Sequence, residues 1–70
     1  SELTVLNPNG LDIKSVTLFD ISGKIVINAK NLGAQNDYSF STQSLSEGVY
    51  VANITVASNQ SISKKVVIKN

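Results

Sequence analysis

Seventy residues make one small domain, close to the lower limit at which a hydrophobic core is stable without disulfides or a metal. The chain has no cysteine and no histidine, which excludes a disulfide framework, a thiolate metal site and the commonest general base. Six lysines and no arginine stand against five acids, and this net charge of +1 is too balanced for a nucleic-acid-binding surface. We therefore expect neither catalysis nor a bound cofactor or metal.

Strand patterns dominate the whole chain. Apolar and polar residues alternate with a period of two, β-branched residues are frequent, and turn residues separate the runs. The expected strands cover residues 3–6, 13–19, 25–27, 37–41, 48–57 and 61–69. Because the connections are short, the pattern predicts an all-β fold, a small antiparallel immunoglobulin- or fibronectin-like sandwich of six to seven strands.

Two early segments carry dense turn chemistry. Asn7-Pro8-Asn9-Gly10 combines a proline with an Asn-Gly pair and is expected to end the first strand. The segment from Asp20 to Lys24 is typical of a hairpin loop, with Asp20 opening the turn and Gly23 in a left-handed conformation. A direct recognition role for Gly23 is the alternative. Residues 30–36 are expected to form a polar loop around one leucine.

Side-chain alternation predicts which residues face the core. Val16 and Leu18 should share one face of their strand, and Phe19 the other. In the longest strand, Tyr50, Ala52, Ile54 and Val56 should face one way, and Val49, Val51, Asn53 and Thr55 the other. Phe19 and Tyr38 are expected to pack, although an exposed platform for a sugar ring is a second interpretation.

The spacing Leu45-x-x-Gly48-x-Tyr50 predicts a corner between two sheets. Gly48 would supply a backbone angle that other residues resist, and the Tyr50 phenol would bond back to the backbone a few residues upstream. This geometry accounts for the motif. Recognition of Gly48 and Tyr50 by a partner is the alternative.

The last strand pattern carries three lysines. Lys64 and Lys65 should point to opposite faces, and Lys69 should fall on the Lys65 side. These lysines are candidate contacts for a partner protein. They would equally protect an edge strand from pairing with other chains, and both interpretations stay open.

Taken in order, these motifs resemble the type A C-terminal sorting domain of the type IX (Por) secretion system of Bacteroidetes bacteria. The resemblance covers residues 13–70. It is carried by Val16-x-Leu18-Phe19-Asp20-x-x-Gly23-Lys24-x-Val26, Leu45-x-x-Gly48-x-Tyr50-x-x-x-Ile54 and the lysine-rich strand that ends at Lys69. Members usually begin with a tyrosine-proline-asparagine-proline-like stretch, whereas this chain has a single proline at Pro8. The resemblance therefore leaves the N-terminal boundary undefined.

The resemblance implies an address for secretion, with no reaction of its own. The domain would be the C-terminal part of a larger secreted protein, and residues 1–70 would form that single domain. It would fold in the periplasm, meet outer-membrane translocon components, and be removed by a sortase-like cysteine protease. The cargo would then be released or attached to the cell surface. We expect a monomer with no nucleic-acid or small-molecule partner.

Two other functions remain open at this stage. The first alternative is an accessory adhesion or carbohydrate-binding sandwich of a surface protein, and the second is a structural spacer between domains. The shortage of aromatic residues favours sorting over carbohydrate binding. So does the lysine-rich strand at the end of the chain, since a sorting domain is expected at the C-terminus.

Overall fold

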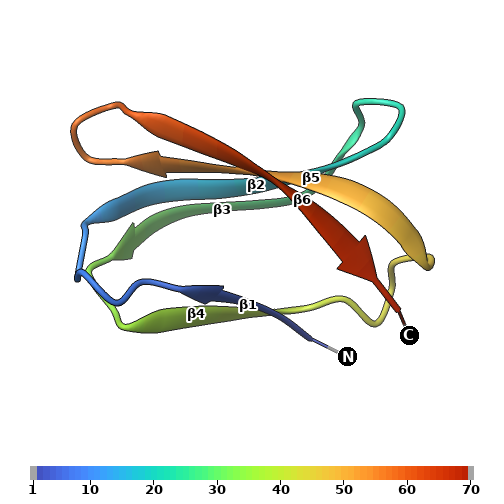
Figure 1. Cartoon of the computed structure of the whole chain (residues 1–70), viewed down its shortest axis with the longest axis horizontal. Coiled ribbons are helices and arrows are strands. Elements are labelled where there is room, and N and C mark those ends of the chain that lie inside the picture. Colours follow the sequence, from blue (N-terminus) through green and yellow to red (C-terminus); the bar gives the residue numbers. More distant parts are fainter. Residues whose placement is uncertain (1, 70) are drawn as a thin grey trace.

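The computed structural model describes residues 2–69, which form six strands and no helix. The strands are β1 (Glu2–Leu6), β2 (Ile13–Asp20), β3 (Ile25–Gly33), β4 (Asp37–Ser41), β5 (Gly48–Val56) and β6 (Ser61–Ile68). β1 pairs with β4 in a small antiparallel sheet, and the other four form a second antiparallel sheet in the order β3-β2-β5-β6. The two sheets face each other (Figure 1), so the predicted all-β sandwich is confirmed.

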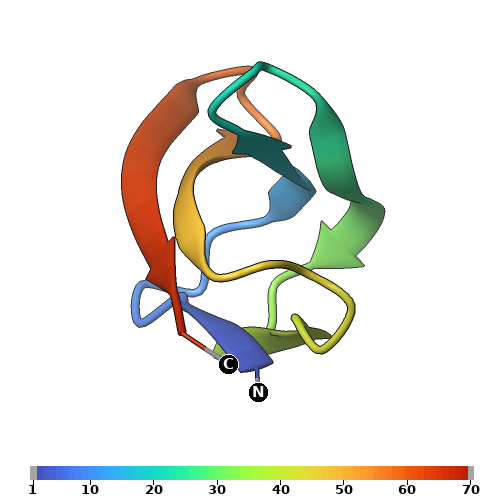
Figure 2. The same cartoon turned by 90° about the vertical axis from the view of Figure 1, so that its right-hand side faces the viewer.

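β2 lies at the centre of the larger sheet. Its neighbours are β3, which follows it through a hairpin, and β5, which returns from the smaller sheet. Leu18 stands between Ile27 of β3 and Ala52 of β5 in the register of the sheet. A view along the strands shows the larger sheet curving over the β1–β4 pair (Figure 2), which encloses the inner face of β2.

The core consists of two apolar clusters between the sheets. Their buried members alternate along the strands, as the period of two requires. One cluster contains Leu18, Tyr50, Ala52 and Ile68, and the other contains Ile13, Val16 and Tyr38. The predicted sidedness of β2 and β5 is confirmed, because Val49 and Val51 on the opposite face are exposed.

β3 is longer than the sequence pattern predicts. The expected strand ended at Ile27 and a polar loop began at residue 30, but β3 continues to Gly33 and pairs with Ile13 there. Backbone pairing with β2 and packing of Leu32 against the second core cluster hold this part in place. The register shifts near Asn31, whose φ of 58° is left-handed, as expected at a bulge. β3 is an edge strand open to solvent, so its end can carry polar side chains. The sequence pattern therefore did not indicate a strand there.

Asn7 joins the turn after β1 to the loop before β4. Its side chain is only 4% exposed, and its amide nitrogen donates to the carbonyl oxygens of Leu11 and Gln35, each at 2.8 Å. Its side-chain oxygen accepts from the Leu11 backbone N–H at 3.1 Å. The Gly10 N–H donates to the Asn7 carbonyl at 3.1 Å, which confirms the predicted turn. The buried amide therefore bonds to both connecting segments at this end of the sandwich.

Tyr38 belongs to the same polar cluster. Its phenol donates to the Gly33 carbonyl and accepts from the Gln35 N–H, the latter at 2.8 Å. The ring is buried in the second core cluster. Packing of Tyr38 is thus confirmed, and an exposed platform formed by Phe19 and Tyr38 is excluded because the two rings do not share a face.

Candidate protein-recognition surface

The motif around Tyr50 forms the predicted corner between the sheets. The chain leaves β4 of the small sheet and enters β5 of the large one through this segment. The Tyr50 hydroxyl donates to the Ser46 carbonyl at 2.7 Å, the tyrosine-corner bond. Leu45 packs against the first core cluster. Gly48 has a φ of 154°, and a Cβ there would meet no atom within 4 Å, so its backbone angle alone explains the glycine.

Replacing Tyr50 by Phe tests this corner. The substitution keeps the ring in the core but leaves the Ser46 carbonyl without its donor. We expect the free energy of unfolding to fall by about 1–2 kcal/mol, the usual cost of losing such a bond. Urea denaturation followed by circular dichroism measures the change. An unchanged denaturation midpoint would show that water replaces the phenol without cost.

Gly23 lies in the β2–β3 hairpin loop. Its φ is 88°, and its N–H donates to the Asp20 carbonyl at 3.0 Å. The Asp20 carboxylate accepts from the N–H groups of Ser22 and Lys24 and from the Ser22 hydroxyl, at 2.9, 3.0 and 2.6 Å. The predicted turn roles of Asp20 and Gly23 are confirmed. The Ser22 hydroxyl, followed by the Lys24 N–H, lowers the pKa of Asp20.

The lowered pKa of Asp20 gives a prediction about pH. Since the folded state binds this proton less readily than the unfolded state, Asp20 favours folding above the ordinary carboxyl range. That contribution is lost as the pH falls through the lowered pKa. Replacing Ser22 by Ala removes the main cause and should raise the Asp20 pKa toward its ordinary value. A carboxyl-carbon NMR titration measures it, and an unmoved Asp20 pKa would contradict the assignment.

The lysines of the last strand divide between the two faces of the sheet. Lys64 pairs with buried Ala52, so it belongs to the inward-facing row of β6 with Ile62 and Val66. Lys65 pairs with exposed Val51 on the outer face, and Lys69 directly follows β6. The predicted opposition of Lys64 and Lys65 agrees with this register. The three candidates therefore do not form one surface.

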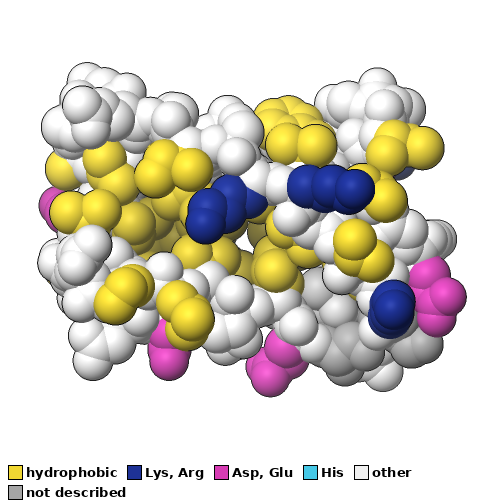
Figure 3. Space-filling view, viewed as in Figure 1, with side chains coloured by type: hydrophobic (Ala, Val, Ile, Leu, Met, Phe, Trp, Pro, Cys, Tyr) yellow, Lys and Arg dark blue, Asp and Glu magenta, His cyan; other side chains and the backbone are white. Residues whose placement is uncertain are grey.

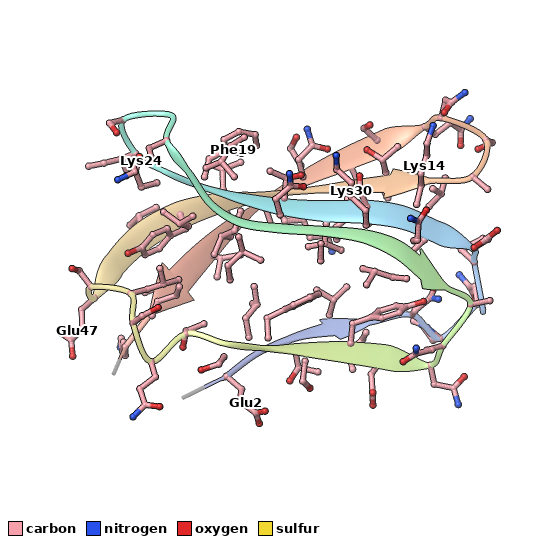
Figure 4. All side chains as sticks on the ribbon, turned by 180° about the vertical axis from the view of Figure 1, so that it is seen from behind. Glu2, Lys14, Phe19, Lys24, Lys30 and Glu47 are labelled. Atoms are coloured by element: carbon pink, nitrogen blue, oxygen red, sulfur yellow. The ribbon has the colours of Figure 1, made fainter. Side chains whose placement is uncertain are left out.

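The outer face of the four-stranded sheet has an apolar half and a polar half. One row across the sheet runs Asn28, Thr17, Asn53 and Ser63, and another runs Ile25, Phe19, Val51 and Lys65. Val49 pairs with Val67 beside the second row. Figure 4 shows Phe19 pointing away from the β1–β4 sheet. We call Phe19, Ile25, Val49, Val51 and Val67 the apolar half.

The exposure of the apolar half makes it a candidate recognition surface. Val67 is 56% exposed, Ile25 51% and Val49 41%. Polar side chains at these strand positions would be compatible with the same sheet. Contiguous exposed apolar side chains mark sites of protein contact. Lys65 lies at the edge of this patch, and the hairpin with Gly23 lies at the same end of the molecule (Figure 1). Sequence reasoning placed Phe19 opposite Leu18, and Val49 and Val51 opposite Tyr50, but it did not predict an exposed apolar patch. The sequence signal that could have indicated this patch was the presence of apolar residues on both faces of β5.

A protein-family comparison covers nearly the whole fold. The model of a family described as a domain of unknown function, DUF8694, matches residues 2–68. The chain belongs to this family. The match spans both sheets of this DUF8694 domain, from β1 to the end of β6. The chain matches no curated protein.

Two kinds of functional feature are absent from the described part of this DUF8694 domain. Within residues 2–69, no group of three or more acidic, histidine or cysteine side chains is placed to hold a metal ion. The same residues contain no helix of the length and hydrophobicity needed to cross a membrane. The apolar half, with Lys65 at its edge, remains the strongest candidate site for a partner.

Proposed function

We propose that this domain is a sorting domain of the type IX secretion system, which directs a cargo protein across the outer membrane. It would fold in the periplasm and act as a protein-recognition module without a reaction of its own. Translocon components of the outer membrane would bind it, and a sortase-like cysteine protease would remove it. The cargo would then be secreted or attached to the cell surface.

The observation that carries this proposal is the apolar half of the outer face. A sorting domain needs a surface that the secretion machinery can bind whatever cargo is attached. The exposed valines, Phe19 and Lys65 supply such a surface on a regular sheet, and the motifs that resemble sorting domains form the turns at the same end. The carbohydrate-binding alternative is less well supported, since Tyr38 and Tyr50 are buried and Phe19 and Phe40 are only partly exposed.

A transplant tests the proposal. Residues 1–70 are fused behind a fluorescent protein that carries an export signal, in a bacterium with a working type IX system. We expect fluorescence in the medium or on the cell surface, and its loss when β6 is deleted. Fluorescence that stays in the periplasm, with the domain folded, would contradict the sorting function.

Surface variants then locate the recognition. Val67→Asp, and the pair Lys65→Gln with Lys69→Gln, should each reduce export at least about tenfold if each weakens binding by about 1.4 kcal/mol. The pair Lys14→Gln with Lys30→Gln makes the same charge change and is the matched control. Circular dichroism confirms that each variant folds. Equal export by the test and control pairs would mean that another surface is read.

A further inference from the structure

β1 and β6 border an open seam of the sandwich. In the described part of the chain, β1 pairs with β4 alone and β6 with β5 alone. Each strand therefore has one edge whose backbone N–H and C=O groups have no strand partner. The two strands converge at the C-terminal end of β6 and diverge toward the β5–β6 turn (Figure 1). The seam is a wedge with strand edges on both sides.

An apolar groove of about 360 Å³ fills this wedge. Figure 3 shows it as a hollow with hydrophobic side chains at its floor and lysine side chains on one side. Ile62, which lines the groove, is 49% exposed. The groove therefore leaves apolar surface in contact with water, and a bound ligand could bury it. Its main apolar residues come from three strands and are Leu3, Val5, Ala52, Ile54, Ile62 and Val66.

The charge in the groove is of one sign. Lys64 belongs to the inward-facing row of β6 and lines the groove with Lys65, and no aspartate or glutamate among the described residues lines it. Lys64 pairs with Ala52 of β5, which has a small side chain. An inward-facing lysine disfavours pairing with a second apolar edge or with another copy of β6. The same lysine favours a strand that brings a carboxylate.

We propose that this seam binds an extended acidic peptide, which adds as a strand along the free edge of β6. Its backbone would bond to the edge groups of β6, as in other cases of strand addition. Alternate apolar side chains would fill the groove, and a glutamate on the same side would face Lys64. A strand can pair with the free edge of β6, whereas a compact small molecule would leave the backbone groups of that edge unpaired. This site does not depend on the proposed export role.

Matched peptides test the assignment. The first is a capped Val-Thr-Val-Thr-Glu-Thr-Val peptide, which places Glu among the valines on one side of a strand, and the second replaces Glu by Lys. We expect the Glu peptide to bind at least about tenfold more tightly, because the like-charge peptide opposes Lys64. Amide NMR shifts of the whole domain should change along β6 and β1. A higher salt concentration should reduce the difference in affinity between the two peptides.

Variants of the domain make the test specific. Lys64→Glu should reverse the order of the two peptides, Lys64→Gln should weaken the preference, and Lys30→Glu on β3 should leave it intact. The dispersion of the amide spectrum shows that each variant is folded. Equal affinity of wild-type protein for both peptides, no binding at millimolar peptide, or shifts confined to the outer face would each overturn the proposal. Any of these results would leave the export experiment unaffected.

Discussion

Leu18→Ala is expected to remove about half of the stability of this domain. Leu18 has no exposed surface and lies in the central strand β2, in contact with the first core cluster. Truncating a fully buried leucine costs about 2–5 kcal/mol, because a cavity remains where the side chain was. A domain of 70 residues has an unfolding free energy of about 4–10 kcal/mol. The variant should therefore unfold at about half the urea concentration that the parent withstands.

Urea denaturation of a matched pair checks this expectation. Ile21→Ala removes an apolar side chain from the neighbouring hairpin loop, where it is 84% exposed, and should change the stability by no more than about 0.5 kcal/mol. Circular dichroism follows both variants. If Leu18→Ala resembled Ile21→Ala, the core would not be organised around β2. The same pair, fused to cargo, shows whether export requires the folded domain.

The features that the sequence predicted are those that depend on local geometry. Period-two alternation placed Leu18 inside, because every second side chain of a strand points to the same face. The Tyr50 corner and the Gly23 hairpin were predicted because each needs a particular backbone angle and a short-range hydrogen bond. In all these cases the residues that interact are only a few positions apart.

The features that the sequence did not predict depend on pairing between distant segments. The polar end of β3 is a strand because it pairs with β2. The alternation of side chains in the sequence does not indicate this pairing. The apolar half of the outer face is exposed because nothing covers it, although its valines look like core residues in the sequence. Lys64 lies beside the groove because β1 and β6 do not meet, which is a property of the whole topology.

Asn7→Ala is the second substitution with a large expected effect. It removes the acceptor of the Leu11 N–H and the donors to the carbonyls of Leu11 and Gln35. Each net hydrogen bond contributes about 0.5–1.5 kcal/mol, and each buried group left unpaired costs about 1–3 kcal/mol. Water can reach part of this cluster, so we expect a loss of about 2–4 kcal/mol in the free energy of unfolding.

Two further variants separate hydrogen bonding from the loss of side-chain volume. Asn7→Asp keeps the shape but, when ionised, cannot donate to the two carbonyls, so at neutral pH it should destabilise the domain about as much as Asn7→Ala. Asn9→Ala, at an exposed position of the same turn, should have little effect. A double-mutant cycle with Tyr38→Phe should show coupling, because the Asn7 amide and the Tyr38 phenol are 3.5 Å apart and share Gln35. Additive effects, or a stable Asn7→Asp variant, would mean that the loops are held by their backbone alone.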